Sequence, residues 1–136
     1  MDNVTKDFFN GYLCSEAIVK NFTDDKSLIK ASTAFGAGIA YNNSLCGALT
    51  GGYLVLSYKQ GRDSNKEDCE QLFENIGKLT NSFKDQFKAC ECPNLLGFKL
   101  SEDGASQRFE QEDCKNKNCA KYIEFVVEKT KELLED

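Results

Sequence analysis

Histidine and tryptophan are absent from this chain of 136 residues, and proline and methionine each occur once. Without histidine, the chain cannot build a Ser-His-Asp or Cys-His catalytic site. It also cannot offer an imidazole ligand to a metal ion or to haem iron. No Cys-x-x-Cys spacing occurs, although this is the usual pattern of thioredoxin-like sites and zinc ribbons. Cysteine and carboxylate side chains are the candidates that remain for chemistry.

The charges and the apolar stretches argue against two further classes of partner. Seventeen basic against 22 acidic side chains give a net charge of -5, and no basic cluster stands out, so we expect no binding of nucleic acid. The longest apolar stretch, 45–58, is broken by glycines and hydroxyl residues, whereas a membrane span needs roughly 20 apolar residues. The amino end lacks a basic start followed by an apolar stretch, so we expect a cytoplasmic protein.

Apolar residues recur at intervals of three and four along most of the chain, and no stretch alternates cleanly as a strand would. The sequence therefore predicts an all-α fold, a single-domain helical bundle of four to five helices over residues 1–136. Segment 35–43 is predicted as a glycine-bearing loop, and 93–96 as a short turn. The helices are expected at about 9–22, 24–31, 45–58 and 66–90, with the last starting between 110 and 118 and running close to the end.

Seven cysteines in a reducing compartment indicate thiolate chemistry or core packing rather than structural disulfides. Free cysteine is among the most buried residue types, so packing is the simplest interpretation of any single one. Cys69 and Cys90 continue an apolar helical stripe and are expected to pack in the core. Cys114 lies among charged residues and is expected to be exposed or at a loop edge.

The other four cysteines are the candidates for chemistry. Cys46, Cys92 and Cys119 are each expected at the amino end of a helix, where free amide donors and the helix dipole lower the pKa of a thiol. Cys14 is expected on the inward face of the first helix. Because these cysteines are far apart in the sequence, any shared centre must be assembled by the fold.

Three glycines follow Cys46 within the third predicted helix, at positions 47, 51 and 52. Each costs a helix about 0.5–1 kcal/mol relative to alanine, so something is expected to approach the backbone closely enough to offset roughly 2 kcal/mol. A neighbouring helix or a bound cofactor would both serve. Gly47 and Gly51 are therefore candidate cofactor-binding positions as well as candidate helix contacts.

Four segments together resemble the redox-active family that is named for its C…GCAxxG…C…C cysteine pattern. The central motif is the specific one, although here the order is Leu45-Cys46-Gly47-Ala48 where the family label reads Gly-Cys-Ala. The resemblance runs from Phe9 to about Val127, and it places the family's four cysteines on Cys14, Cys46, Cys92 and Cys119. The segments that carry it are 9–17, 35–51, 92–97 and 119–122.

This family also looks related to the non-haem part of split-Soret cytochromes, where the implied cofactor is an iron–sulfur centre held by cysteines. The haem half does not carry over, because the chain lacks both Cys-x-x-Cys-His and histidine. The resemblance implies no particular substrate.

Three interpretations of function follow. In the first, Cys14, Cys46, Cys92 and Cys119 bind an iron–sulfur cluster, or zinc as another metal, in a module for electron transfer. In the second, the chain is a metal-free thiol/disulfide redox protein, with Cys46 as the catalytic thiol. In the third, it is a non-catalytic helical scaffold with buried thiols. A redox partner protein is expected under the first two, and both enzyme activity and a homodimer stay open.

Overall fold

The computed structural model describes residues 3–135, and within that range the chain forms helices, one isolated β-bridge and no strand. The prediction of an all-α fold is confirmed. The prediction of four to five helices is wrong, because irregular backbone divides the chain into more and shorter segments. They are α1 (Asn3–Phe9), α2 (Cys14–Phe22), α3 (Lys26–Ala31), a 3-10 turn (Thr33–Phe35), α4 (Gly36–Tyr41), α5 (Gly47–Gln60), α6 (Glu70–Phe87), α7 (Cys92–Leu96), α8 (Ala105–Gln111), a π-helix (Lys115–Cys119) and α9 (Ala120–Glu135).

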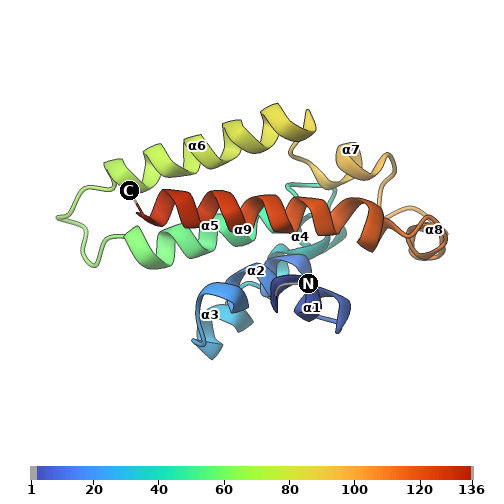
Figure 1. Cartoon of the computed structure of the whole chain (residues 1–136), viewed down its shortest axis with the longest axis horizontal. Coiled ribbons are helices and arrows are strands. Elements are labelled where there is room, and N and C mark those ends of the chain that lie inside the picture. The colour runs from blue at the N-terminus through green and yellow to red at the C-terminus, as the bar shows by residue number, and fades with distance from the viewer. Residues whose placement is uncertain (1–2, 136) are drawn as a thin grey trace.

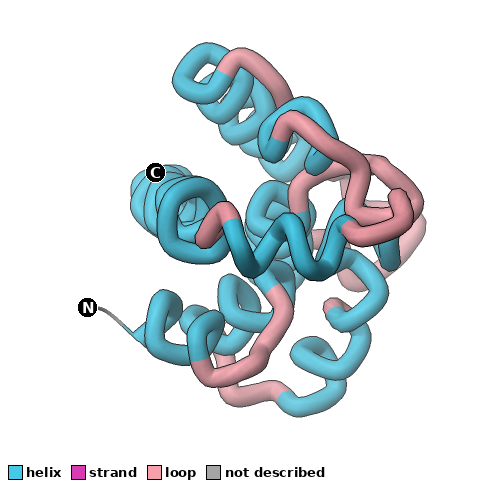
Figure 2. Tube along the Cα trace, turned by 90° about the vertical axis from the view of Figure 1, so that its right-hand side faces the viewer, coloured by secondary structure: helices cyan, strands magenta, loops and turns pink. Residues whose placement is uncertain are grey.

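The three longest helices lie side by side along the long axis of the molecule. Figure 1 shows that α6 runs opposite to α5 and α9, and α1, α2 and α3 pack on the other side of α5 and α9. Figure 2 shows the helices end-on, packed around one another, with loops at the upper right and further loops at the lower edge of the molecule. The most extensive contact in the molecule is between α2 and α5. No helix among residues 3–135 is long and apolar enough to cross a membrane.

The core follows the apolar pattern of the long helices. Leu49 and Leu56 of α5 are fully buried, as expected for the helix that is apolar on all sides. Leu79 and Phe83 of α6 are also fully buried, and they belong to the apolar stripe of that amphipathic helix. Burial of side chains of this size stabilises the fold by about 1.5–3 kcal/mol each. The long helices thus form because their apolar faces cover one another.

An aromatic cluster fixes the end of the bundle where α7 lies. The rings of Phe83, Phe87, Tyr122 and Phe125 contact one another between α6 and α9, with centroids 4.8 to 6.1 Å apart. Tyr122 also donates its hydroxyl to the carbonyl of Leu95 at 3.2 Å. This bond ties the middle of α7 to the first turn of α9.

The first helix was predicted at about 9–22, but it begins five residues later, as α2 at Cys14; Phe9 is the last residue of α1, which was not predicted, and residues 10–13 form a turn. Gly11 has a φ of 105°, a left-handed conformation that favours glycine. The backbone N–H of Leu13 donates to the Glu16 carboxylate at 2.8 Å, which caps the start of α2. Cys14 is therefore the first residue of a helix rather than a residue within one.

The segment predicted as a glycine-bearing loop forms α4, a turn of left-handed helix. All residues from Ala37 to Tyr41 have φ between 54° and 65°. Left-handed backbone costs a residue other than glycine about 1–2 kcal/mol. Contacts with the rest of the fold must therefore hold this turn in place, and one of them is the bond from the Ser44 N–H to the Gly38 carbonyl at 3.0 Å.

The last predicted helix is correct in its second half and wrong in its first. Helix α8 was not predicted, and α9 is preceded by a π-helix in which the Ala120 N–H donates to the Lys115 carbonyl, five residues earlier. Tyr122, Val126 and Leu133 of α9 are buried, as their helical spacing favours. Asn118 is a residue type that often caps a helix start, but here it lies inside the π-helix and caps none.

Candidate functional site

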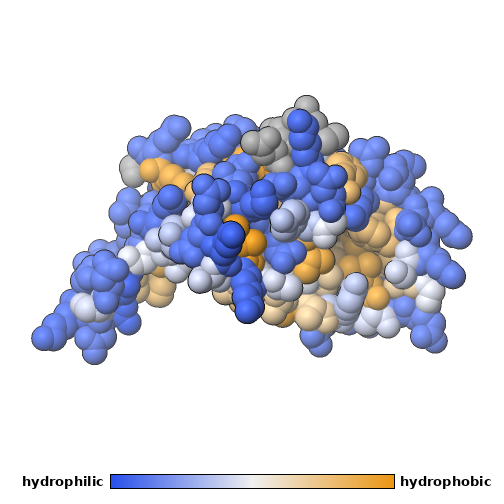
Figure 3. Space-filling model, turned by 90° about the horizontal axis from the view of Figure 1, so that it is seen from below, coloured by the Kyte–Doolittle hydropathy of each residue, from blue (hydrophilic) through white to orange (hydrophobic). Residues whose placement is uncertain are grey.

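A cavity of about 250 Å³ opens at the end of the molecule where α1, α7 and α8 lie. Cys14, Cys46, Cys92 and Cys119 all line it. In the described part of the chain, its lining contains one charged side chain, that of Lys115, and no carboxylate. Most of the other lining residues are apolar or aromatic: Phe8, Tyr12, Leu13, Leu95, Leu96, Leu100, Phe109 and Tyr122. The space-filling view in Figure 3 shows an apolar hollow at this end of the molecule.

Each cavity cysteine comes from a different element. Cys14 begins α2, Cys46 is the N-cap of α5, Cys92 begins α7, and Cys119 ends the π-helix just before α9. These elements span most of the described chain. The cysteine-lined cavity is thus a product of tertiary structure rather than of any local sequence motif.

A short β-bridge places Cys46 beside the segment that contains Cys92. Leu45 pairs with Glu91 in the antiparallel sense. The Cys46 N–H donates to the Cys90 carbonyl at 2.8 Å, and the Cys92 N–H donates to the Ser44 carbonyl, also at 2.8 Å. Because these bonds satisfy the backbone at the starts of both α5 and α7, they fix the two cysteines in register.

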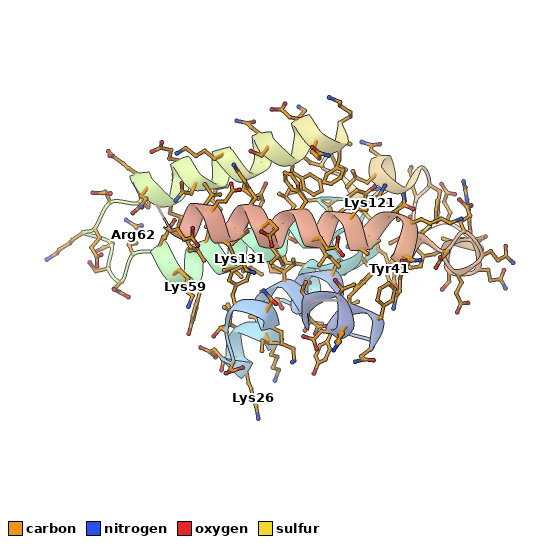
Figure 4. All side chains as sticks on the ribbon, viewed as in Figure 1. Lys26, Tyr41, Lys59, Arg62, Lys121 and Lys131 are labelled. Atoms are coloured by element: carbon orange, nitrogen blue, oxygen red, sulfur yellow. The ribbon has the colours of Figure 1, made fainter. Side chains whose placement is uncertain are left out.

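The left-handed turn α4 covers two of the cavity cysteines. The Ala37 N–H forms a hydrogen bond to the Cys14 thiol. A Cβ added at Gly38 would lie 2.9 Å from the Cβ of Cys92, so only glycine fits there. Tyr41, at the end of the same turn, lines the cavity with 59% of its surface exposed, and Figure 4 shows it at the end of the molecule near α1. It therefore lies at the cavity mouth.

The two candidate glycines of α5 lie on one face of the helix but have different neighbours. A Cβ at Gly47 would lie 2.2 Å from the Cys14 sulfur and 3.0 Å from the Phe35 carbonyl oxygen. A Cβ at Gly51 would lie 2.8 Å from the Ile18 Cβ and 3.0 Å from the Ser15 carbonyl oxygen. Gly47 lines the cavity, and Gly51 is absent from its lining. The structure thus places Gly47 at the cysteine-lined cavity and Gly51 in the contact between α5 and α2.

Burial dominates the acidity of the cavity thiols. It raises the pKa of Cys14, and hydrogen bonds from the backbone N–H groups of Ala37, Ser15 and Gly47 oppose this increase. Burial and the nearby Cys14 raise the pKa of Cys46 well above its ordinary value. Hydrogen bonds from the N–H groups of Ala48 and Leu49 lower this pKa, but by less.

The remaining two cavity thiols behave in the same way. Burial, with Cys14 and Cys114 nearby, raises the pKa of Cys92 to about 12. Burial and the other cavity thiols also raise the pKa of Cys119 well above its ordinary value. In the absence of a bound cation, all four are therefore neutral thiols at neutral pH.

The prediction of low-pKa thiolates at helix ends is therefore wrong for Cys46, Cys92 and Cys119. At Cys46 the expected amide donors are present, but removal of the thiol from water raises its pKa by more than these donors lower it. At Cys92 no amide donor contributes, and α7 is only five residues long. At Cys119 no free helix end exists, because the π-helix runs directly into α9.

Among the three other cysteines, Cys90 and Cys114 are buried and Cys69 is not, whereas Cys69 and Cys90 were the two predicted to pack in the core. Cys90 is buried in the core, as predicted. Cys69 is only half-buried, as the N-cap of α6 at the opposite end of the bundle. Cys114 was predicted to be exposed or at a loop edge. It does follow directly on a turn, but its side chain is only 2% exposed, because it packs with Phe98 and Ala105 in a second apolar cluster. All seven cysteines are free thiols.

The cavity cysteines do not already form a metal-binding arrangement. Within residues 3–135, no group of three or more cysteine, aspartate or glutamate side chains is placed so that it could hold a metal ion. The four thiols line the same cavity and affect one another electrostatically. Their sulfur atoms do not converge on a single position, as ligands of one metal ion would.

The family model that matches this chain is described as "Putative redox-active protein (C_GCAxxG_C_C)" and covers residues 12–133. The chain belongs to this family. All four cavity cysteines lie inside the matched range, so family membership supports a redox role. No curated protein and no solved structure matches the chain at a significant level.

Sequence reasoning missed several residues of this family member's cavity. Ala37 and Gly38 lie in a segment that carries part of the family resemblance, but they were assigned to a loop and given no role at the site, although they contact Cys14 and Cys92. Tyr122 is a buried residue of α9 that also lines the cavity. The glycine-bearing segment 35–43 was the signal available for α4, but left-handed backbone over non-glycine residues has no sequence signature.

Proposed function

We propose that this protein is an electron-transfer module in which Cys14, Cys46, Cys92 and Cys119 hold an iron–sulfur cluster. The observation that carries the proposal is that four cysteines from four separate elements line one cavity without a carboxylate. Thiolates are the ligands of iron–sulfur clusters and of other soft metal ions, whereas carboxylates favour harder ones. The donor set therefore suits a cluster, with zinc as the alternative ion.

The surroundings of the thiols also suit a cationic cofactor. Four thiolates in an apolar cavity would be costly to bury, and the raised pKa values express that cost. A metal centre removes the cost because its positive charge replaces the four protons. Binding would require the thiol side chains to rotate toward the centre of the cavity, since they are not yet placed as ligands.

The backbone around the cavity would hold and tune such a centre. When bound, a cluster supplies one-electron chemistry through its iron atoms. The amides of Ala37 and Gly47 point at the Cys14 sulfur, and those of Ala48 and Leu49 point at the Cys46 sulfur. Amide donors to cluster sulfurs change the reduction potential. Gly47 leaves the space that the Cys14 sulfur occupies.

Anaerobic reconstitution with iron and sulfide tests this function. We expect visible absorption, bound iron and bound sulfide in the native chain, and their loss in each of the four Cys→Ser variants at positions 14, 46, 92 and 119. Cys69→Ser is the matched control, because Cys69 lies at the far end of the bundle. A centre that survives Cys46→Ser and Cys92→Ser would contradict the proposal. Zinc without colour would favour the alternative ion, and lost thiols without metal would favour a thiol/disulfide protein.

A further inference from the structure

Lys115 is the one charged side chain that lines the cysteine-lined cavity within residues 3–135. Its ammonium nitrogen lies 5.0 Å from the centre of the Phe8 ring. It forms no ion pair with a carboxylate of the described chain, whereas Lys20, for example, pairs with Asp7. The face of an aromatic ring attracts a cation but does not neutralise its charge. The cavity therefore contains one positive charge that no protein group balances.

The walls around this charge are apolar and rich in aromatic rings. Phe8, Tyr12, Tyr41 and Phe109 line the same cavity. The cavity volume is about 250 Å³, and an apolar cavity of about 150 Å³ is enough to hold one benzene ring. Tyr12 and Tyr41 are exposed, and the apolar hollow is visible from outside in Figure 3. A molecule with one ring can therefore enter from solvent and fit inside.

The thiols and the ammonium belong to different parts of the lining. Cys14 and Cys92 lie against glycines of α5 and α4. Phe8 and Phe109 come instead from α1 and α8, and the ammonium of Lys115 lies over the Phe8 ring. The cavity thus has a thiol part and an aromatic part, and its positive charge belongs to the aromatic part.

From this combination we propose that the aromatic part of the cavity binds a small aromatic monocarboxylate, with its ring against the aromatic side chains and its carboxylate at Lys115. One ammonium balances one negative charge, whereas a phosphate group carries about −1.5 to −2 at neutral pH. Apolar walls with a few placed polar groups are typical of small-molecule sites. The inference uses the shape and charge of the metal-free cavity and does not depend on the proposed cluster.

A second hollow at the other end of the bundle is the competing site. It is lined by Tyr58, Arg62 and Phe73, and Figure 4 shows Arg62 at the opposite end of the molecule from Tyr41. Its lining also includes Asp63, and Arg62 already donates to backbone carbonyls. The positive charge there is therefore less available to a carboxylate than that of Lys115.

Three probes of similar size test which charge the site selects. Benzoate, benzyl alcohol and benzylamine each have one ring and are negative, neutral and positive at pH 7. Each is titrated into the reduced, metal-free full chain, and amide chemical shifts report the affinity. We expect benzoate to bind roughly tenfold more tightly than benzyl alcohol, the lower end of the range for a hydrogen bond to a charged group, because Lys115 is half-exposed. Benzylamine should bind most weakly, and any other order would overturn the proposal.

The position of the bound ring is tested in the same samples. Nuclear Overhauser contacts should connect the ring protons of benzoate with the side chains of Phe8 and Phe109. Contacts with Tyr58 or Phe73 alone would place the ligand in the second hollow and would overturn the assignment. Acetate carries the charge without the ring, so acetate that binds as tightly as benzoate would show that the aromatic walls do not contribute.

Lys115→Met tests the role of the ammonium. This variant should bind benzoate roughly tenfold more weakly and benzyl alcohol as the native chain does. Lys117→Met is the matched control and should change neither affinity, because Lys117 belongs to the same π-helix but is exposed and does not line the cavity. Benzoate affinity that is equal in the native chain and Lys115→Met would contradict the proposal. If Lys115→Met does not fold, the order of the three probes on the native chain decides.

Iron reconstitution separates this inference from the proposed function. A chain that binds benzoate in the cavity but no cluster would contradict only the proposed function. A chain that binds a cluster but, when metal-free, no benzoate would contradict only the aromatic carboxylate site.

Discussion

The two ends of the bundle are built by different means, although the same long helices connect them. At the end away from the cavity, α5, α6 and α9 are regular helices that bury side chains such as Leu72 and Leu133. At the cavity end, the backbone includes a left-handed turn, a β-bridge and a π-helix. The comparison shows that the regular helices supply the rigid frame, and that irregular backbone brings distant cysteines to one place.

Gly47→Ala should produce the largest effect, because it changes the point where the regular helix α5 meets the cavity. The added Cβ would lie 2.2 Å from the Cys14 sulfur and close to backbone atoms of Phe35 and Gly36. Forced overpacking of this kind typically costs about 1–3 kcal/mol. We expect a lower free energy of unfolding in urea and the loss of iron binding together.

Gly77→Ala is the matched control for this substitution. Gly77 lies inside α6, and nothing lies within 4 Å of an added Cβ. The change should stabilise the protein by about 0.5–1 kcal/mol, because alanine is the better helix former. A stabilising Gly47→Ala would show that the cavity end adapts as easily as an exposed helix surface, contrary to the close contact described.

Alkaline pH should weaken the cavity end of the metal-free, reduced protein. The pKa of Cys92 rises from its ordinary value of 9.0 in the unfolded chain to about 12 in the folded one. Below pH 9 both states keep the proton, so its contribution to stability is fully present. Between pH 9 and 12 only the unfolded state loses the proton, so stability decreases as pH rises.

The measurement is the free energy of unfolding in urea at several pH values in this range. Other groups also titrate there, including Tyr53 and Tyr122, whose pKa values burial raises as well. Cys92→Ser removes this thiol, and it also removes the contribution that Cys92 makes to the raised pKa values of Cys119 and Tyr122, so the variant should show a shallower decrease. Identical slopes in the two proteins would contradict burial as the cause of the raised pKa of Cys92.

Ala40→Gly and Ala31→Gly should give the smallest effects, and effects of opposite sign. Both alanines are exposed, but Ala40 has a φ of 55° in the left-handed turn and Ala31 ends the right-handed helix α3. Glycine should stabilise position 40 by about 1 kcal/mol, because it adopts left-handed backbone without steric cost. It should destabilise position 31 by about 0.5–1 kcal/mol. Thermal unfolding of both variants checks the signs, and destabilisation by Ala40→Gly would show that the turn is not left-handed in solution.

The sequence by itself determined the regular part of this protein. Periodic apolar residues predicted the all-α class and the stripe of α6, since a helix of 3.6 residues per turn repeats its contacts at fixed intervals. The second helix was expected to start at Asp24 or Asp25, and Asp25 is the N-cap of α3, where its carboxylate accepts from the Ser27 N–H at 2.9 Å. Such local signals depend on few residues and short distances along the chain.

Only the tertiary structure decided how the cysteines are arranged and what their environment does to them. The left-handed backbone of Ala37 and Ala40 is unfavourable locally, so it exists only because contacts from distant elements hold it. The amide donors at Cys46 were foreseeable, but the burial that outweighs them depends on α2, α7 and α9. Cys114 reads as exposed in the sequence and is buried because Phe98 and Ala105 fold over it. Burial and proximity are sums over the whole fold, and no short stretch of sequence contains them.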